Sequence, residues 1–411
     1  MKLKIVKGTR DLYDDAIVPF LYLEKKARHI FELYGYSEIR TPIFERTDLF
    51  AHGVGQDTDI VGKEMFLLED RRGRSLALRP EATASVVRSV ITGNMMKQNN
   101  QKRLFYMGPM FRYEQPQKGR FRQFFQIGAE LFGVATPDAD LELLLMLRHY
   151  FKSIQLDNVS FQLNTIGCHK SDCRPAFKEK LVTYLKENQD AFCENCQQRI
   201  ESNPLRVLDC KNESCIALTE NAPRIYEHVC DDCRDHFNEL ESLLELHQVE
   251  YTKNFRLVRG LDYYSGTVFE VYSDNLGAQN AVGGGGRYDR LFELYGAKSI
   301  PAFGFALGLD RLALLTKPVL PDKKVAFVIC NDRAKATEIV AKCREAEWVC
   351  HYDPFQSSMK SQFRQANKSS ANLVLVLGED ELKTGQISVK NMQTGEQVSI
   401  KQEEVSAYLQ K

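Results

Sequence analysis

The 411-residue sequence lacks the features that mark membrane and secreted proteins. No uninterrupted apolar run reaches the roughly 18 residues that a membrane-spanning helix needs. The opening residues, MKLKIVKGTRDLY, are charged throughout and contain no apolar core of a signal peptide. Internal repeats and low-complexity tracts are absent as well. We therefore expect a globular cytoplasmic protein with no membrane partner, and its length predicts two or three domains.

A net charge is also missing, because 55 Lys and Arg residues balance 55 Asp and Glu residues. The overall charge therefore gives no indication of a nucleic-acid partner. The local distribution does, since seven basic residues between positions 97 and 122 stand against one acid, Glu114. Such a cluster suits phosphate groups, although it is also typical of a solvated face. The seven are Lys97, Lys102, Arg103, Arg112, Lys118, Arg120 and Arg122.

The secondary-structure pattern changes along the chain. Apolar residues spaced from Phe20 to Tyr34 predict an amphipathic helix that Gly35 ends, and the segment 37–50 then reads as extended. Residues 170–246 are helical in pattern and rich in cysteine. Two prolines in TKPVLPD, residues 316–322, indicate a linker, after which strand and helix patterns alternate as in a small α/β domain.

The hairpin pattern FRYEQPQKGRFRQFFQIGAE, residues 111–130, has the composition of a nucleotide site. Side chains two apart on a strand share a face, so Arg112 and Glu114 should point together. The same rule aligns five residues of the returning strand: Arg122, Phe124, Gln126, Gly128 and Glu130. A guanidinium can bind phosphate oxygens, and an aromatic ring can stack on a base. A half-exposed amphipathic hairpin is the alternative.

Four further segments carry polar chemistry beside apolar patterns: RPEATASVVR (79–88), RGLDYYSGTVFEV (259–271), AVGGGGRYDRL (281–291) and FGFALGLDRLALL (303–315). In the second, a cation, a carboxylate and two phenols precede a strand pattern. The four glycines suit a pocket wall, because glycine lets the backbone approach a ligand closely, although such a run also fits a linker. RPEAT likewise fits ordinary helix capping. Asp310 and Arg311 begin a helix, where phosphate is attracted.

These five segments, in this order, resemble the histidyl-tRNA synthetase family, which belongs to the class II aminoacyl-tRNA synthetases. The resemblance runs over nearly the whole chain. It implies ATP-dependent ligation of L-histidine to tRNA(His) through a histidyl-adenylate, with release of AMP and pyrophosphate, and Mg²⁺ accompanying ATP. It also implies a homodimer with segment 37–50 at the interface. A regulatory subunit of ATP phosphoribosyltransferase or a tRNA-sensing module is the alternative, but neither requires the intact motifs present here.

The resemblance assigns roles to the matching positions. Arg259 would stand over the α-phosphate, where most class II relatives place a metal ion, and Arg259 and Arg112 are the expected catalytic residues. The residues expected to bind histidine are Glu81, Thr83, Gln126, Glu130, Tyr263 and Tyr264. The residues expected to bind ATP are Arg112, Glu114, Arg120, Phe124 and Arg311.

Eight of the eleven cysteines lie between Cys168 and Cys233, in a segment that departs from the general pattern of the family. Its two CxxC pairs have the spacing of tetrahedral thiolate zinc. We expect structural Zn²⁺ at one or two sites, with Cys193, Cys196, Cys230 and Cys233 as ligands. Such a metal should stabilise this module without taking part in adenylation. Reduced structural cysteines and redox pairs are the alternatives.

We therefore predict an α+β protein built on the class II synthetase antiparallel sheet with flanking helices. A helical cysteine-rich insertion, residues 170–246, should separate a catalytic core of residues 1–169 and 247–320. A C-terminal α/β anticodon-binding domain should occupy residues 325–411. No editing domain is evident, which suits a substrate whose polar imidazole can be selected by hydrogen bonds.

Overall fold

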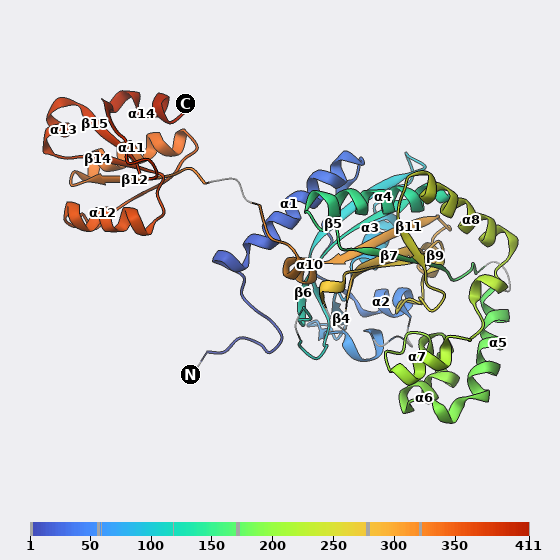
Figure 1. Ribbon diagram of the computed structural model, residues 1–411. Helices are drawn as coiled ribbons and strands as arrows, with labels where there is room; N and C mark the ends of the chain where they lie inside the picture. The colour runs from blue at the N-terminus through green and yellow to red at the C-terminus, as the bar shows by residue number, and fades with distance from the viewer. Residues whose placement is uncertain are drawn as a thin grey trace. The chain divides into compact units, whose positions relative to one another are not determined.

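The structure of the chain is a computed structural model that describes residues 3–55, 58, 60–117, 119–169, 173–276, 280–319 and 323–410. The chain divides into two compact units, Met1–Pro318 and Val319–Lys411, whose elements are labelled in Figure 1. The division falls within the predicted linker 316–322, of which residues 320–322 lie outside the described part, as does Lys118. Within the described residues, no helix is long and apolar enough to cross a membrane.

The first unit contains an eight-stranded sheet with the strand order β1-β5-β6-β11-β10-β9-β7-β8. The six central strands run antiparallel to one another, whereas the edge strands β1 and β8 pair in parallel. The predicted antiparallel sheet is therefore confirmed. The strands are β1 (Ser37–Glu38), β5 (Lys102–Phe111), β6 (Gln123–Phe132), β7 (Ser160–Thr165), β8 (Tyr251–Lys253), β9 (Ser265–Tyr272), β10 (Ala281–Arg287) and β11 (Ala302–Gly308).

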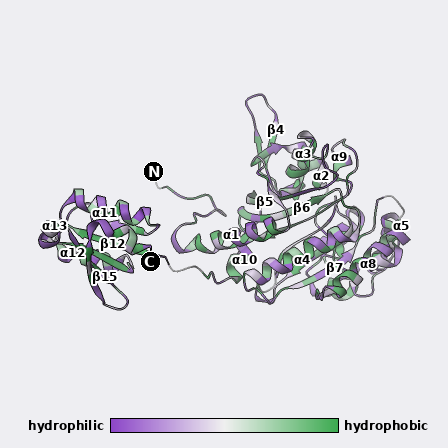
Figure 2. Cartoon of the chain, turned by 90° about the horizontal axis from the view of Figure 1, so that it is seen from above, coloured by the Kyte–Doolittle hydropathy of each residue, from purple (hydrophilic) through white to green (hydrophobic). Residues whose placement is uncertain are grey.

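Helices flank this sheet, with a hydrophobic core on each face (Figure 1). The helices of one core are α1 (Val18–Leu33), α4 (Pro137–Ser153), α8 (Asp231–Leu246) and α10 (Leu309–Leu315). Those of the other are α2 (Thr47–Val54), α3 (Thr83–Thr92) and α9 (Leu291–Leu294). Strand alternation separates the cores, because Phe105 of β5 packs in the first, whereas Leu104 and Tyr106 pack in the second. Figure 2 shows the apolar residues concentrated on the strands.

Two predictions for the N-terminal region have different outcomes. The predicted helix is α1, and Gly35 follows it with φ +79°, the left-handed conformation that commonly ends helices. The extended reading of segment 37–50 is wrong for its last part, because Thr47 begins α2. Its strands β1 and β2 (Phe44–Arg46) belong to different sheets, and the second sheet has the order β2-β4-β3. The other strands of that sheet are β3 (Leu67–Glu69) and β4 (Ser75–Leu78).

The insertion is helical in its described residues, as predicted. Besides α8, its helices are α5 (Cys173–Glu187), α6 (Glu194–Ser202) and α7 (Glu213–Thr219), with the short 3-10 segments η3 (Gln189–Ala191), η4 (Pro204–Val207) and η5 (Ile225–His228). Its last helix, α8, packs on α4, where Nε2 of His236 lies 2.9 Å from Oδ2 of Asp140. The guanidinium of Arg287, on β10, lies 2.7 Å from the other oxygen of Asp140. The end of the insertion is therefore tied to the large-sheet unit through Asp140, which His236 and Arg287 both contact.

The second unit is the predicted small α/β domain. Its five-stranded sheet has the order β13-β12-β14-β15-β16, with parallel pairing among the first three strands and an antiparallel hairpin at the end. The strands are β12 (Val325–Cys330), β13 (Val349–Tyr352), β14 (Leu373–Leu377), β15 (Gln386–Asn391) and β16 (Gln397–Lys401). The helices are α11 (Arg333–Glu345), α12 (Met359–Lys368), α13 (Glu379–Thr384) and α14 (Val405–Leu409).

Candidate active site

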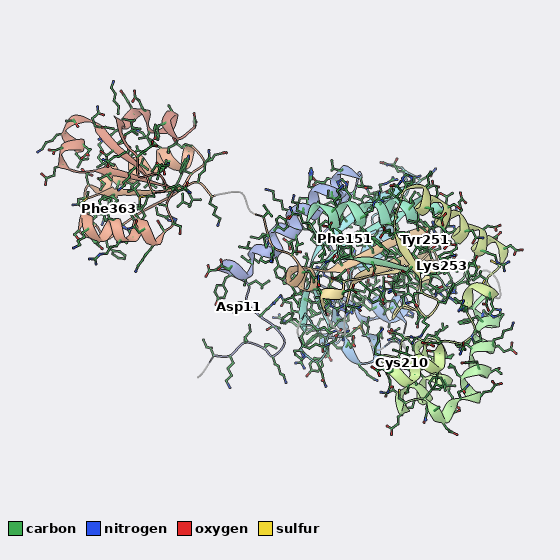
Figure 3. The ribbon with its side chains drawn as sticks, in the orientation of Figure 1. Asp11, Phe151, Cys210, Tyr251, Lys253 and Phe363 are labelled. Atoms are coloured by element: carbon green, nitrogen blue, oxygen red, sulfur yellow. The ribbon has the colours of Figure 1, made fainter. Side chains whose placement is uncertain are left out.

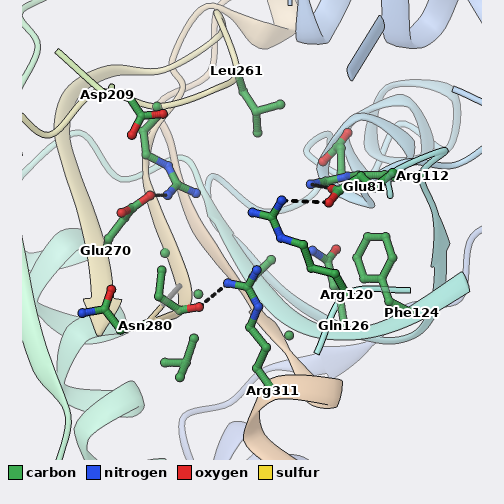
Figure 4. A pocket seen from close by; sticks show the side chains of 18 of the residues that line it. Glu81, Arg112, Arg120, Phe124, Gln126, Asp209, Leu261, Glu270, Asn280 and Arg311 are labelled. Carbon is green, nitrogen blue, oxygen red and sulfur yellow. Dashed lines mark hydrogen bonds and ion pairs between the residues drawn. The ribbon is translucent and has the colours of Figure 1, made fainter. Parts of the chain in front are cut away.

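A cavity of about 870 Å³ lies against the central strands of the large sheet. Its walls come from strands β6, β9, β10 and β11, from the loop 259–264 that precedes β9, and from residues 193–212 of the insertion. Figure 4 shows carboxylates, guanidinium groups and an aromatic ring around it. The volume is typical of a site for small molecules. All of the residues predicted to bind histidine or ATP line this cavity, except Glu130.

Glu130 lies fully buried behind one end of the cavity. Its two oxygens accept hydrogen bonds from the hydroxyl groups of Thr83, at 2.9 Å, and Tyr288, at 2.5 Å. Burial raises the pKa of Glu130 to about 8. Gly304 lines the cavity in front of it, and a Cβ atom there would lie 1.6 Å from Oε2 of Glu130. Glu130, which we expect to bind histidine, therefore lies with its carboxylate directly against the wall of the cavity.

Glu81 occupies the same end of the cavity and has a second role. Its carboxylate accepts hydrogen bonds from the backbone N–H groups of Thr83, at 2.6 Å, and Ala84, at 2.9 Å, at the start of α3. RPEAT therefore caps a helix, as the alternative predicts, and its residue Glu81 also lines the cavity. Burial raises the pKa of Glu81 as well. Two buried carboxyl groups with hydroxyl and amide donors are chemically suited to an ammonium group.

The loop before β9 brings Arg259 and two phenols into the cavity. Tyr263 and Tyr264 have ring centroids 4.7 Å apart, and Tyr263 packs edge-to-face on Tyr288 at 5.7 Å. The guanidinium of Arg259 lies 5.4 Å from the ring centre of Tyr264, within cation–π range. Its Nη1 lies 2.5 Å from Oε1 of Glu270. The cation is therefore fixed in place on two sides.

Three arginines lie beside one carboxylate and one aromatic ring in the wall of the cavity. Nε of Arg112 donates to the carbonyl of Pro80 at 2.9 Å, and its guanidinium lies 5.3 Å from the ring centre of Phe124. Arg120 and Arg112 lie 3.1 Å and 3.9 Å from the oxygens of Glu114. Arg311, at the start of α10, donates to the carbonyl of Ala281. The predicted pairing of Arg112 and Glu114 on one side is confirmed.

Arg122 has a different place from the one that strand alternation predicts. The strand β6 begins at Gln123, so Arg122 belongs to the loop before it, and its guanidinium stacks 3.8 Å over the ring of Tyr113. Phe124 and Gln126 line the cavity, as alternation requires, and Glu130 lies deeper along the same strand face.

The four glycines form the middle of β10, between β9 and β11, so the linker alternative is wrong. A Cβ on Gly285 would lie 2.0 Å from the carbonyl oxygen of Gly304. A Cβ on Gly284 would lie 2.5 Å from the carbonyl oxygen of Phe269 and 2.8 Å from Nη1 of Arg259. Glycine is therefore required for the strand to lie this close to its neighbours and to the cation.

Comparison with known proteins identifies the family. A family model described as histidyl-tRNA synthetase matches residues 8–312, and one described as an anticodon binding domain matches residues 324–411. The chain belongs to the histidyl-tRNA synthetase family.

Members of the histidyl-tRNA synthetase family match the chain over its whole length. A histidine–tRNA ligase of Maridesulfovibrio salexigens is 44% identical over 409 residues, covering 98% of this chain and 99% of its own. One of Halothermothrix orenii is 44% identical over 408 residues, covering 97% of each. The crystal structure of apo S. aureus histidyl-tRNA synthetase has a TM-score of 0.83 and 33% identity, with full coverage of both chains. The predicted class II fold with its C-terminal domain is confirmed by these matches.

Several residues of the cavity in this family member were not predicted from the sequence. Those from the catalytic strands and their connection are Glu270, Tyr272 and Asn280, and those from the insertion are Cys193, Asn195, Arg199, Asp209, Cys210, Lys211 and Asn212. Glu270 could have been found, because it is the one carboxylate in the otherwise apolar strand pattern TVFEVY. The insertion residues carry no comparable signal, since their approach depends on tertiary packing.

The cysteines of the insertion form two clusters of four. In the basal cluster, at the entry and exit of the insertion, the members are Cys168, Cys173, Cys230 and Cys233. In the distal cluster, around α6 and α7, they are Cys193, Cys196, Cys210 and Cys215. The four sulfur atoms of each cluster lie within 4.8 Å of one another. Each predicted CxxC pair therefore belongs to a different cluster, and Cys168, Cys173, Cys210 and Cys215 are further candidate ligands.

Hydrogen bonds to sulfur give both clusters a common geometry. The backbone N–H of Cys230 donates to Sγ of Cys173 at 3.1 Å, and that of Cys193 donates to Sγ of Cys215 at 3.4 Å. The backbone N–H of Cys196 lowers the pKa of Cys193 to about 7, whereas burial raises the pKa of Cys215. Such clusters could hold a metal ion.

Proposed function

We propose that this enzyme condenses L-histidine with ATP to histidyl-adenylate and pyrophosphate. It then transfers the histidyl group to the 3′-terminal ribose of tRNA(His) and releases AMP. The observation that carries the proposal is the convergence of five separate segments on one cavity, which carboxylates, arginines and two tyrosines line together. Family membership over the whole length supports it. We assign the catalytic core to residues 1–169 and 247–320, the insertion to 170–246 and the anticodon-binding domain to 325–411.

Histidine would occupy the end of the cavity that contains the buried carboxyl groups. Its ammonium group would lie near Glu81, Thr83 and Gln126, with the negative charge of Glu130 behind them. Its imidazole would lie against Tyr263 and Tyr264, whose hydroxyl groups can donate or accept a hydrogen bond. This orientation leaves the histidine carboxylate facing the α-phosphate of ATP, which it must attack.

ATP would occupy the part of the cavity that Arg112, Arg120 and Arg311 line, and Mg²⁺ would enter as part of the nucleotide complex. Adenine would stack on Phe124, and its edge would contact Glu114. Arg120 and Arg311 would bind the outer phosphates, and Arg112 the α-phosphate. Nη1 of Arg120 lies 3.1 Å from Oε2 of Glu114, and Nη1 of Arg112 lies 3.9 Å from Oε1. These contacts hold the two guanidinium groups beside Glu114, where phosphates and the adenine edge would meet them.

Arg259 and Arg112 would be the catalytic residues. As the histidine carboxylate attacks, negative charge increases on the α-phosphate oxygens, and a guanidinium already fixed beside them stabilises that charge without reorganising solvent. The contact of Arg259 with Glu270 keeps the cation oriented before the substrates bind. Binding both substrates in one cavity also replaces a bimolecular encounter by a positioned one. A bond forms between a carboxylate oxygen of histidine and the α-phosphorus, and the bond from the α-phosphorus to pyrophosphate breaks.

We also propose that each cysteine cluster of the insertion binds one structural Zn²⁺. A tetrahedron with Zn–S bonds of about 2.3 Å has sulfur atoms roughly 3.8 Å apart. The Sγ atoms of Cys168 and Cys230, and those of Cys193 and Cys210, are each 3.9 Å apart. This spacing fits one ion per cluster and is too long for a disulfide. The basal cluster would clamp the two ends of the insertion, since Cys168 and Cys230 are 62 residues apart in sequence.

A homodimer and a cytoplasmic location complete the proposal. Apolar side chains gather on and beside the sheet β2-β4-β3, where Ile43, Phe44, Leu67 and Leu68 are between 43% and 60% exposed. A second copy of the chain would cover these side chains, two of which, Ile43 and Phe44, belong to segment 37–50. Reduced thiols suit a cytoplasmic location.

Histidine-dependent exchange of labelled pyrophosphate into ATP tests the proposal. We expect exchange with histidine and not with other amino acids, followed by aminoacylation of tRNA(His) by the same preparation. A regulatory subunit or a tRNA-sensing module would bind ligands without exchange, and that result would reject the proposed reaction.

A further inference from the structure

The distal cluster lies at the wall of the catalytic cavity. Two of its cysteines, Cys193 and Cys210, line the cavity together with Asp209 and Lys211 of the same segment. Figure 3 places Cys210 in the insertion, and Figure 4 shows Asp209 on the same side of the cavity as Glu270. The catalytic motifs lie outside the insertion in sequence, but this cluster lies beside the residues that they contribute to the cavity.

A defined set of contacts joins this wall to the loop that carries Arg259. Nη2 of Arg256 donates to the carbonyl oxygen of Leu208 at 3.0 Å. Nη1 of Arg206 lies so close to Gly260 that a Cβ there would be 3.2 Å from it. Segment 204–212, which we name the insertion wall, thus packs against residues 256–260 immediately beside the proposed catalytic arginine.

The loop has backbone anchors only on either side of Arg259 among the described hydrogen bonds. Before it, the carbonyl of Leu257 accepts a hydrogen bond from Asn164 at 2.9 Å, and after it, the N–H of Asp262 donates to the carbonyl of Val54 at 3.0 Å. Between these anchors, Arg259 contacts Glu270 and the ring of Tyr264, and the insertion wall contacts the nearby residues Arg256 and Gly260. The position of the wall therefore bears on the position of the cation.

The insertion wall itself depends on the distal cluster. Segment 204–212 contains Cys210 and connects α6, of nine residues, to α7, of seven residues. Helices of this length are not stable alone in water, so their order depends on tertiary contacts. Ligation by Cys193, Cys196, Cys210 and Cys215 would couple the binding free energy of a metal to the order of this segment.

We infer that a metal ion in the distal cluster holds the insertion wall against the 256–260 loop and thereby positions Arg259 for adenylation. This inference rests on the proposed function. Arg206 and Arg256 act as positioning residues, and neither of them needs to contact the reacting atoms. Because Arg259 acts on charge that develops in the transition state, loss of the wall should lower kcat more than it raises the KM values of the substrates.

Two variants separate the metal from the contact that transmits its effect. Cys210→Ser should reduce bound zinc from about two equivalents to about one, and it should lower kcat of pyrophosphate exchange by at least about tenfold. Arg256→Met removes the hydrogen bond to Leu208 and leaves all eight cysteines in place. It should keep both metal ions and lower kcat by roughly five- to tenfold, with the KM for ATP changed by less than about threefold. Arg256→Lys should recover part of the rate.

The matched control is Arg148→Met. Arg148 also donates to carbonyl groups immediately after the insertion, those of His247 at 2.7 Å and Gln248 at 3.0 Å, but it does not line the cavity. Its exchange kinetics should remain within about twofold of the original protein.

Three results would overturn the inference: an Arg256→Met protein with unchanged kcat, a Cys210→Ser protein that loses one metal ion without losing rate, or an original protein with no metal in the distal cluster. Should Cys210→Ser not fold, Arg256→Met still decides. Absence of exchange in the metal-loaded original protein would instead reject the proposed function.

Discussion

The hydroxyl group of Tyr288 lies 2.5 Å from Oε2 of Glu130, and both side chains are buried. The other carboxylate oxygen accepts a hydrogen bond from Thr83 at 2.9 Å. Both partners are neutral hydroxyl groups, so hydrogen bonds only partly offset the desolvation of a charge. This explains why burial raises the pKa of Glu130 to about 8 in the ligand-free protein. The bound ammonium group of histidine would supply the missing positive charge.

Histidine affinity should therefore depend on pH through Glu130. Below pH 8 the free protein holds a proton on this carboxyl group, and binding of the ammonium group must release it. The affinity should rise with pH up to about 8, by at most about tenfold per pH unit. The KM for histidine in pyrophosphate exchange, measured at several pH values, checks this.

The matched control is Glu130→Gln, which has the same ligand titrations but no titrating carboxyl group. Its KM for histidine should be raised far more than its KM for ATP, and the pH dependence attributed to Glu130 should disappear. Equal increases in both KM values, or an unchanged pH profile, would contradict the assignment.

The same pKa predicts a change in protein stability. The folded-state pKa of about 8 exceeds the ordinary value of 4.5, so the stability contribution of Glu130 is full below pH 4.5 and is lost as pH rises through 8. Glu130→Gln should therefore gain stability relative to the original protein between these limits, by on the order of a few kcal/mol at most. Urea unfolding of both proteins without histidine, at pH 5 and pH 8.5, measures the difference. A constant difference across this range would show that Glu130 titrates normally.

Arg259→His should lower the rate of adenylation by at least about two orders of magnitude, with a smaller change in histidine affinity. The reason is that imidazole is shorter and mostly neutral at pH 7, so the charge on the α-phosphate would lose its fixed partner. Single-turnover formation of adenylate gives the rate directly. Glu270→Gln is a useful companion, because it keeps the cation and removes its orienting carboxylate, and it should cause a smaller loss. Near-normal turnover of Arg259→His would exclude a catalytic role.

Gly284→Ala should impair the site through crowding and not through chemistry. The new Cβ would lie 2.5 Å from the carbonyl oxygen of Phe269 and 2.8 Å from Nη1 of Arg259. We expect a loss of stability of roughly 1–3 kcal/mol and a lower kcat, because β9 and the guanidinium must both shift. Gly62→Ala is the control, since a Cβ there meets nothing within 4 Å. Thermal unfolding and exchange kinetics that are the same for both variants would show that β10 tolerates side chains.

The sequence predicts the catalytic site well because most of its information is local. Alternation on β6 places Phe124 and Gln126 in one wall, and the glycines interpreted as a pocket wall include Gly283 and Gly284, which line the cavity. The motif segments also match a known family, which places them around common substrates. Alternation predicts which face of a strand a residue shares but not its depth, and Glu130 lies fully buried behind the cavity wall.

The arrangement of the insertion could not be predicted in the same way. Spacing identifies each CxxC pair, but the second pair of each cluster comes from elsewhere in the chain, and its identity depends on how the helices pack. The position of Asp209 and Cys210 in the catalytic cavity likewise results from long-range contacts, such as that between Arg256 and Leu208. Such long-range contacts cannot be predicted from the spacing of residues in the sequence.

Elemental analysis of freshly purified, reduced protein should give about two equivalents of zinc per chain, one for each cluster of four cysteines. Cys233→Ser and Cys215→Ser should each remove about one equivalent, because the two residues belong to different clusters.

The effects of these two variants on stability should differ. The basal cluster joins residues 62 apart and clamps both ends of the insertion, so its loss should expose more of the module to limited proteolysis. Thiol modification under native conditions gives the complementary measurement, since zinc-bound cysteines react slowly and become reactive when a chelator removes the metal. Zinc below about 0.2 equivalents, with all eight thiols open to modification, would leave both clusters without a metal. Loss of both equivalents in either single variant would mean that the clusters do not bind independently.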